Sequence, residues 1–251
     1  MSTKSQKLGV FVFAMMNVAL VMSLRGLPII AKTGYQMIFY VLFASFLFLL
    51  PVSLVSAELA TGWPKEGGVY RWVKEAFGSK MGFTAIWLQW VQNTIWYSTV
   101  LAFAAGALSY LFLDPSLSSN KIFIVAIILI IYWGATFINF IGLKAASWFT
   151  TACVLGGTIF PAILIIALGV VWMAMGHTID PQNASMDIMP NFKDMNSIAF
   201  LAGTVLLFAG MEVSAVHVMD LKNPKSSYPK AIFLAILIIV ICFLFGSFAI
   251  F

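Results

Sequence analysis

The feature that most limits the fold of this chain is the length of its apolar segments. A helix needs about 20 apolar residues to cross the hydrocarbon core of a bilayer. Segments of this kind run over residues 8–31, 36–62, 81–113, 121–142, 147–175, 197–220 and 230–251. In lipid, only helices and closed barrels satisfy every backbone polar group, and these segments are too long and too uniformly apolar for barrel strands. We therefore predict an all-α membrane protein with about seven transmembrane helices.

The composition agrees with a lipid environment. The chain is 62% hydrophobic and 9% charged, whereas a soluble domain carries about 25% charged residues. The net charge of +5 does not indicate nucleic-acid binding, because the basic residues are scattered among loops. Cys153 and Cys242 fall inside apolar segments, which argues against a disulfide framework and predicts small buried hydrophobic residues.

Lysine and arginine predict the orientation, since cytoplasmic loops carry the excess of these residues. With the N-terminus inside, the inner side holds Lys4, Lys7, Lys65, Arg71, Lys74, Lys80, Lys144, Lys222, Lys225 and Lys230. The outer side holds Lys32, Lys121 and Lys193, with Arg25 near it. The inner set is the larger, so we predict a cytoplasmic N-terminus. The first apolar run is too long for a signal peptide and precedes further spans, so we interpret it as a membrane helix.

The stretch "GGVYRWVKEAFG", residues 67–78, differs from the apolar segments. Its apolar residues recur at helical spacing, and Arg71, Lys74 and Glu75 lie on other faces. This pattern predicts a short amphipathic helix at the inner membrane surface. An ordinary solvated loop is the alternative.

Two of the apolar segments contain residues that a membrane helix should avoid. In "VMSLRGLPIIAKTG", residues 21–34, Arg25, Gly26 and Pro28 fall within four positions of the first segment. In "LFAGMEVSAVHV", residues 207–218, Gly210 and Glu212 interrupt the sixth segment. Polar groups inside a membrane are costly and usually functional. We therefore predict that the first span is broken at Ser23–Pro28 and the sixth at Gly210 and Glu212; for either break alone, a packing kink is the alternative.

A broken helix frees backbone groups that lipid cannot satisfy, so breaks persist where they line a cavity. The freed N–H groups attract a carboxylate, and the freed carbonyls accept hydrogen bonds from an ammonium group. Two breaks that face each other would suit a zwitterion. Breaks in spans one and six are also what an inverted repeat of five helices produces. We expect residues 8–175 to form the first repeat and residues 197–251 to begin the second.

The third apolar segment carries a polar face. Gln89, Gln92, Asn93 and Trp96 recur at steps of three and four, so we expect them to face the interior of the helix bundle. Hydrogen bonding between helices without substrate contact is the alternative for each of them. The sequence shows no metal cluster, no nucleophile with a nearby base and no phosphate loop. We therefore expect neither an enzyme nor a bound metal or cofactor.

Two longer motifs resemble a known superfamily. "AELATGWPKEGGVYRWVKEAFG", from Ala57 to Gly78, resembles the signature after the second helix of the amino acid–polyamine–organocation transporters. "GMEVSAVHVMDLKNPKSSYPKA", from Gly210 to Ala231, resembles their sixth helix and the following loop. Together with "GALSYLF" from Gly106 and with His217, these motifs resemble the bacterial glutamate/γ-aminobutyrate antiporters. The resemblance covers essentially the whole chain.

The resemblance implies a LeuT-type inverted-repeat transporter fold with a substrate site between spans one, three, six, eight and ten. The family has about twelve spans and this chain reaches its seventh, so we expect the N-terminal half only, as a single incomplete transmembrane domain over residues 1–251. Carried over by position, the first break would meet the substrate carboxylate, and the Phe208–Glu212 region would meet its amino group. The implied substrate-binding residues are Ser23, Arg25, Gly26, Leu27, Gln89, Asn93, Trp96, Phe208 and Gly210. Glu212 would act in gating or proton sensing.

The activity implied by the resemblance is secondary amino acid antiport. A glutamate-like amino acid would be exchanged for a related amino acid or amine by alternating access, in a multi-pass protein of the bacterial inner (plasma) membrane. The implied partners are the amino acid, protons in a proton-coupled cycle, and the lipid bilayer; nucleic acid is not among them. The alternatives are a neutral or cationic amino acid/polyamine exchanger of the same superfamily, and a membrane amino acid sensor that does not transport. The oligomeric state stays open.

Arg25 has three possible partners. It could extend its head group toward the outer surface, where Lys32 lies two turns further on. It could pair with Glu212, because the two breaks should be neighbours in such a fold. It could also bind the side-chain carboxylate of an acidic substrate, where the planar guanidinium offers two parallel hydrogen bonds.

Overall fold

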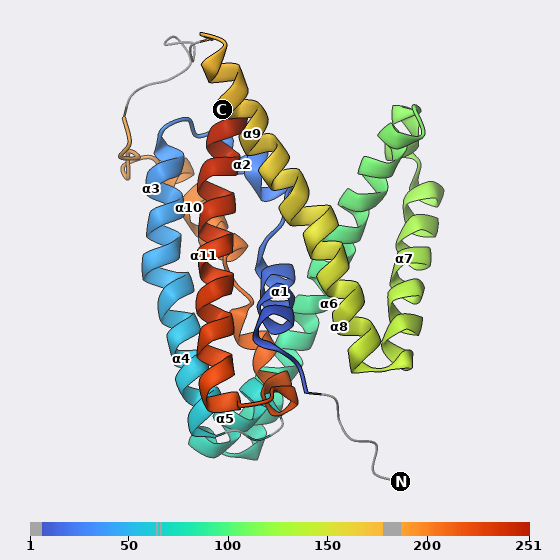
Figure 1. Ribbon diagram of the computed structural model, residues 1–251, viewed down its shortest axis with the longest axis vertical. Helices are drawn as coiled ribbons and strands as arrows, with labels where there is room; N and C mark the ends of the chain where they lie inside the picture. The colour runs from blue at the N-terminus through green and yellow to red at the C-terminus, as the bar shows by residue number, and fades with distance from the viewer. Residues whose placement is uncertain (1–6, 64, 66, 178–186) are drawn as a thin grey trace. The chain divides into compact units, whose positions relative to one another are not determined.

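A computed structural model of the chain describes residues 7–63, 65, 67–177 and 187–251. These residues fold into helices, and the β-structure found among them is an isolated bridge between Leu8 and Leu221 (Figure 1). The predicted all-α class is therefore confirmed. Lys4, which contributed to the predicted orientation, lies outside the described residues.

Six helical stretches of the described chain are long and apolar enough to cross a membrane. They are Gln36–Gly62, Ser79–Leu111, Lys121–Ile141, Leu143–Ala174, Met195–Asp220 and Pro224–Ile250. Each overlaps one of the predicted spans. The first predicted span does not reach this length, because it is divided into the short helices α1 (Val10–Val21) and α2 (Gly26–Ala31). The predicted interruption of this span is thus present.

The chain divides into two compact units. The first comprises Met1–Gly68 together with Ser147–Phe251, and the second comprises Val69–Ala146. The first unit contains α1 and α2, followed by α3 (Gln36–Ala44), the wide π-type turns of η1 (Ser45–Leu49) and α4 (Leu50–Gly62). It continues with most of α8 (Leu143–Val154), η3 (Leu155–Ile159), α9 (Phe160–Ala174), α10 (Met195–Leu207), η4 (Met211–Asp220) and α11 (Pro224–Ile250).

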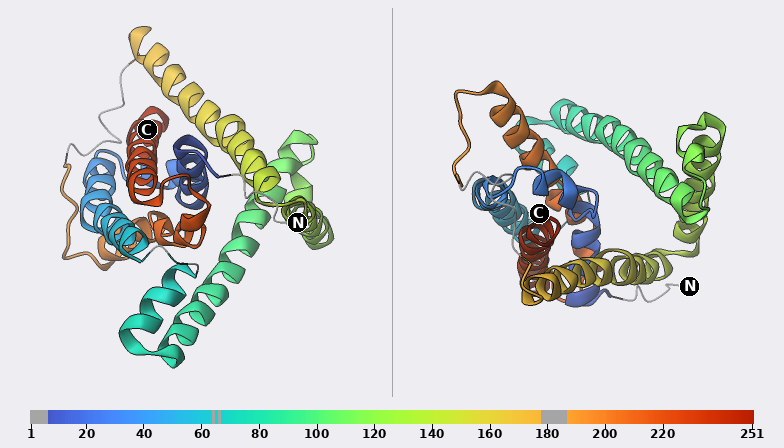
Figure 2. Two further views of the ribbon diagram at one scale, coloured as in Figure 1. Left: turned by 60° about the horizontal axis from the view of Figure 1, so that its bottom comes forward. Right: turned by 90° about the horizontal axis from the view of Figure 1, so that it is seen from above.

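Helix α11 is the centre of the first unit. It packs against α1, α2, α3, α4 and α9, and both Figure 1 and Figure 2 show it, in red, between the light-blue α3 and the dark-blue α1. Its buried positions are Tyr228, Ala231, Ile232, Ala235, Ile239, Cys242, Phe243, Gly246 and Ser247. The ring of Tyr228 lies 5.3 Å from that of Phe13 of α1, measured between centroids. The face of α11 that the protein does not cover exposes Phe233, Leu237 and Phe245, so the helix is apolar on all sides, as expected where one side meets protein and the other meets lipid.

Small residues bring helices of this unit close together. A Cβ added at Gly169 of α9 would lie 2.6 Å from Cβ and 3.0 Å from Cα of Ala249 in α11. Without a hydrophobic driving force between helices in lipid, such close backbone packing is a main source of helix association.

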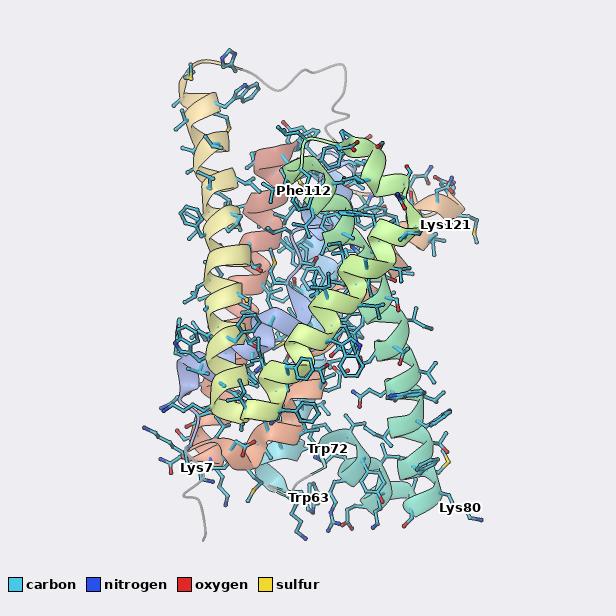
Figure 3. All side chains as sticks on the ribbon, turned by 90° about the vertical axis from the view of Figure 1, so that its right-hand side faces the viewer. Lys7, Trp63, Trp72, Lys80, Phe112 and Lys121 are labelled. Carbon is cyan, nitrogen blue, oxygen red and sulfur yellow. The ribbon has the colours of Figure 1, made fainter. Side chains whose placement is uncertain are left out.

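The second unit is a helical hairpin preceded by a short helix. It contains α5 (Gly68–Phe77), α6 (Ser79–Leu111), η2 (Pro115–Ser119) and α7 (Lys121–Ile141). The side chain of Asn120 caps α7 by accepting hydrogen bonds from the backbone N–H groups of Ile122 and Phe123. Within this unit, Trp72 and Lys80 lie at one end and Phe112 and Lys121 at the other (Figure 3).

Helix α5 confirms the short helix predicted over "GGVYRWVKEAFG". Arg71 and Glu75 form an ion pair of 2.9 Å one turn apart on it. Its position at a membrane surface stays a prediction. Of the two cysteines, Cys242 is buried as predicted, whereas Cys153 is exposed, since it lies on a face of α8 that the protein does not cover.

The contact between α9 and α11 predicts the effect of Gly169→Ala. The new methyl group would meet the backbone of Ala249 rather than a flexible side chain, so the two helices would have to separate. We expect a loss of about 1–3 kcal/mol in the free energy of unfolding, the usual cost of overpacking. Gly203→Ala in α10 is the matched control, because nothing lies within 4 Å of an added Cβ there. Thermal unfolding in detergent measures both; equal unfolding midpoints for the two variants would contradict the prediction.

Candidate functional site

The first break separates α1 from α2. The N–H of Met22 donates to the carbonyl of Val18 at 2.7 Å and ends α1. The chain then turns through Ser23–Arg25, and α2 begins at Gly26. The break was predicted to extend to Pro28, and this is wrong, because Pro28 lies in the first turn of α2. Proline is tolerated there since its missing N–H has no helical partner in any case.

The first break leaves backbone groups unpaired. Among the described residues, the N–H groups of Ser23, Leu24 and Arg25 donate no backbone hydrogen bond. The carbonyls of residues 19–22, at the end of α1, accept none. Such groups cost free energy when they are buried without a partner. The break therefore presents both donors and acceptors to whatever lies beside it.

The second break separates α10 from η4. Helix α10 ends at Leu207, and η4 starts at Met211 after Gly210, whose φ of 126° is in the region that favours glycine. Within the described chain, the carbonyls of Phe208 and Ala209 accept no backbone hydrogen bond. The interruption was predicted to include Glu212, but this residue lies in the first turn of η4. A carboxylate is favoured there because the N-terminal end of a helix carries partial positive charge.

The two breaks lie next to each other. A Cβ added at Gly210 would lie 3.4 Å from the carbonyl oxygen of Leu20, near the end of α1. A Cβ added at Gly26 would lie 2.7 Å from the ring of Phe243 and 3.6 Å from Leu207, the last residue of α10. A Cβ at Gly26 would clash with the ring of Phe243, and at Gly210 it is the φ of 126° that favours glycine. The unpaired N–H groups and carbonyls of the first break and the unpaired carbonyls of the second thus share one region, an arrangement suited to a molecule with an ammonium and a carboxylate group.

Apolar side chains of the predicted site are enclosed beside the breaks. Leu27 is fully buried, and it packs against Gly246 of α11. Phe208 is 1% exposed, and its ring lies 4.8 Å from that of Phe243 between centroids. Ser23 and Glu212 are half-buried. Leu27 and Phe208 thus form apolar surroundings beside the breaks, whereas Ser23 and Glu212 keep part of their surface accessible.

Arg25 is half-buried, and its Nε atom is enclosed without a hydrogen-bond partner. Among the described residues Arg25 forms no ion pair; Arg71 pairs with Glu75, and His217 Nδ1 lies 3.1 Å from Asp220 Oδ2. The pairing of Arg25 with Glu212, one of the three alternatives, is therefore not observed. An enclosed donor left unpaired typically costs about 1–3 kcal/mol. Arg25 thus offers a hydrogen-bond donor beside the first break.

The predicted residues of the third span lie on α6, in the second unit. Gln89 and Asn93 are half-buried, and the side chains of both form no hydrogen bond with any described residue. Gln92 is exposed. Trp96 is 40% exposed, and its ring contacts that of Tyr97 at 5.4 Å between centroids. Their approach to the breaks stays a prediction.

Three buried polar residues near the breaks were not predicted. Asn17 of α1 is fully buried; its Nδ2 donates to the carbonyl of Phe13 at 2.8 Å, and its Oδ1 has no partner within the described chain. The hydroxyl groups of Ser214 in η4 and Tyr228 in α11 lie 3.3 Å apart, and both residues are buried. Their position as polar residues inside apolar segments could have predicted that Asn17 and Ser214 have a function. Tyr228 could not be found in this way, because the predicted seventh span began at residue 230.

Comparisons with known proteins identify the family of this membrane protein. The family model for amino acid permeases matches residues 8–251. The chain therefore belongs to the amino acid permease family, within the amino acid–polyamine–organocation superfamily, and the predicted resemblance is confirmed. Members of this family are transporters rather than enzymes.

Three relatives are similar to this chain over nearly its whole length. An uncharacterised transporter of Legionella pneumophila is 42% identical over 250 residues, which are 100% of this chain and 53% of that protein. A glutamate/γ-aminobutyrate antiporter of Lactococcus lactis is 30% identical over 98% of this chain and 49% of its own length. A probable agmatine/putrescine antiporter of the same species is 25% identical over 100% of this chain and 52% of its own length. The chain thus spans about half the length of these relatives.

The geometry of the second break predicts the effect of Gly210→Ala. A side chain at φ 126° is strained, whereas the added Cβ would only reach van der Waals contact with the carbonyl of Leu20. We expect a loss of about 1–3 kcal/mol in the free energy of unfolding, the usual cost of a residue held in such a conformation. The measurement is thermal unfolding in detergent, again beside Gly203→Ala, which should unfold at the parental temperature. A parental midpoint for Gly210→Ala would show that the break does not need glycine.

Proposed function

We propose that this permease is a secondary amino acid transporter that binds its substrate at the two adjacent breaks and moves it by alternating access. The observation that carries the proposal is the approach of Gly210 to the carbonyl of Leu20, since it brings the unpaired backbone groups of both breaks together. Irregular backbone at membrane depth is tolerated where it lines a cavity, and transporter sites are commonly built from such discontinuous helices.

The assignment of the substrate's two ends follows from the direction of the half-helices. The N–H groups of Ser23–Arg25 precede α2, so they would receive the carboxylate. The carbonyls of Phe208 and Ala209 end α10, so they would receive the ammonium group. Gly26 and Gly210 permit close approach, and Leu27 and Phe208 exclude water. Gln89, Asn93 and Trp96 of α6 would complete the site.

The surrounding architecture is part of the same proposal. Residues 8–175 would form the first five-helix repeat of a LeuT-type fold, and residues 197–251 would begin the second, within a single transmembrane domain. The position of the breaks in spans one and six supports this arrangement. The excess of basic residues on one side and the bacterial relatives support a place in the bacterial inner membrane with a cytoplasmic N-terminus.

We favour a glutamate-like substrate exchanged for a related amino acid or amine. The relative named as a glutamate/γ-aminobutyrate antiporter supports antiport of this kind. The unpartnered Nε of Arg25 supports an acidic side chain, because a guanidinium binds a carboxylate through charge-assisted hydrogen bonds. A cationic substrate is the second candidate, and the relative named as an agmatine/putrescine antiporter supports it.

Counterflow in proteoliposomes tests the proposed function. The full-length protein would be reconstituted in vesicles loaded with one unlabelled compound from a panel of glutamate, γ-aminobutyrate, glutamine, arginine and putrescine, with the same labelled compound outside. We expect transient accumulation of label for glutamate and γ-aminobutyrate. A membrane sensor would bind a ligand without accumulation, and accumulation of arginine or putrescine alone would select the cationic alternative.

Arg25→Gln is predicted to change substrate selectivity. If Arg25 binds the side-chain carboxylate, the affinity for glutamate should fall about tenfold or more, because breaking a desolvated charge pair costs about 2–5 kcal/mol. The affinity for glutamine should change little, since glutamine lacks that carboxylate. Competition binding on the reconstituted protein measures both affinities.

Arg71→Gln serves as the matched control for Arg25→Gln, because it removes the same charge from α5, where Arg71 is paired with Glu75. It should leave the ratio of the two affinities unchanged. Equal, modest losses for glutamate and glutamine in Arg25→Gln would remove the acidic-substrate proposal. Such losses would favour the alternative in which the guanidinium of Arg25 extends toward the outer membrane surface.

Glu212→Gln is predicted to flatten the pH dependence of exchange. Glu212 lies in the first turn of η4, two residues after the break. Glutamine keeps the size of the side chain and removes its carboxylate. Exchange rates measured between pH 4.5 and 8 should then vary less in the variant than in the parent; an unchanged profile would limit Glu212 to packing or gating.

A further inference from the structure

Two buried hydroxyl groups link α11 to η4. Tyr228 of α11 and Ser214 of η4 are 0% and 2% exposed, and their hydroxyl oxygens lie 3.3 Å apart. The hydroxyl of Ser214 also donates to the carbonyl of Met211 at 3.1 Å. A hydroxyl group has one hydrogen, so the hydrogen between the two side chains must come from Tyr228. The bonds therefore run in one direction, from Tyr228 through Ser214 to the main chain of Met211.

This chain of hydrogen bonds ends next to the second break. Met211 is the first residue of η4 and directly follows Gly210. In the same turn, the N–H of Val213 donates to the carbonyl of Gly210 at 3.1 Å. The bond to Met211 therefore fixes the turn that begins at Gly210. The unpaired carbonyls of residues 208 and 209, which would receive the ammonium group of the substrate, directly precede this turn.

Helix η4 needs support from outside. It is a 3₁₀-helix of ten residues, whereas runs of more than about four residues are uncommon because the hydrogen bonds of such helices have poorer geometry. Tyr228 can give this support because it is itself held by two helices. It belongs to the continuous helix α11, and its ring lies 5.3 Å from that of Phe13 in α1, measured between centroids.

We propose that Tyr228 is a positioning residue of the substrate site. Through Ser214, it holds the first turn of η4 so that the carbonyls of the second break face the ammonium group of the substrate. This inference rests on the proposed transport function. Tyr228 acts through Ser214 and the main chain rather than by contact with the substrate. Its loss should therefore weaken recognition of the ammonium group and leave recognition of the other parts of the substrate unchanged.

Tyr228→Phe tests the proposal, because it removes the hydroxyl group and keeps the ring beside Phe13. The full-length protein would be reconstituted, and competition binding would compare glutamate with glutarate, which is glutamate without its amino group. We expect the preference for glutamate over glutarate to fall about two- to tenfold, the effect of one hydrogen bond. The affinity for glutarate should change little.

Tyr40→Phe is the matched control. Tyr40 of α3 is 1% exposed, and its hydroxyl donates to the carbonyl of Ser197, at the opposite end of α10 from the second break. This variant loses a buried hydroxyl of the same unit, so it should keep the parental preference for glutamate.

Ser214→Ala provides an independent variant, because it removes the middle of the chain of hydrogen bonds. It should lower the preference for glutamate as Tyr228→Phe does. The double variant should lower it no further than Ser214→Ala alone, since both changes interrupt the same chain. Fully additive effects of the two substitutions would show that Tyr228 does not act through Ser214, and would overturn the proposal.

A second readout needs no substrate. Hydrogen exchange of the backbone N–H groups, followed by mass spectrometry in detergent, should be faster over residues 211–214 in Tyr228→Phe than in the parent and in Tyr40→Phe. Unchanged exchange there would overturn the proposal. Faster exchange with an unchanged preference for glutamate, or equal losses of affinity for glutamate and glutarate, would limit Tyr228 to a structural role and would overturn it as well. If the parent binds no glutamate, the proposed glutamate-like substrate fails, and hydrogen exchange still decides whether Tyr228 holds the first turn of η4.

Discussion

The rest of this structure depends on the need of every backbone N–H and C=O group for a partner where water is absent. This need makes the apolar segments helical and makes an interruption costly. Two interruptions are nevertheless present, at residues 22–25 and 208–210. They lie beside each other, since a Cβ added at Gly210 would lie 3.4 Å from the carbonyl oxygen of Leu20, so the unpaired groups of the two breaks share one region. This pairing turns two costly features into one polar region inside an apolar unit, and the proposed substrate would provide the missing partners.

The packing around the breaks explains how the region is kept rigid. Helix α11 contacts both halves of the first span: its Tyr228 meets Phe13 of α1, and its Phe243 meets Gly26 of α2. Phe243 also stacks on Phe208 at the end of α10. One continuous helix thus positions the elements on either side of both breaks.

Much of this fold could be predicted from the sequence, since apolar length and the turn residues between segments determine the spans. Arg25, Gly26 and Gly210 correctly marked the breaks, because each is disfavoured in an apolar helix. The exact limits could not be predicted: Pro28 fits the first turn of a helix as well as a break, and Glu212 fits the start of η4. Asn17 and Tyr228 are polar groups whose burial depends on tertiary contacts with other helices. Gln89 and Asn93 could not be placed either, because their spacing shows that they share a face of α6 but does not show which element this face contacts.

The contact of Gly210 with Leu20 has a consequence for how such a protein can change during evolution. It depends on main-chain atoms, which are the same in every sequence. The groups that would bind the carboxylate and ammonium of any amino acid would therefore tolerate most substitutions at neighbouring positions. The parts that distinguish one substrate from another would be met by side chains such as those of Arg25, Leu27 and Phe208. Binding of the backbone groups of an amino acid and selection of its side chain would then evolve independently. A lineage could acquire a new cargo by substituting a few side chains, while the shape of the polypeptide at the breaks stayed the same.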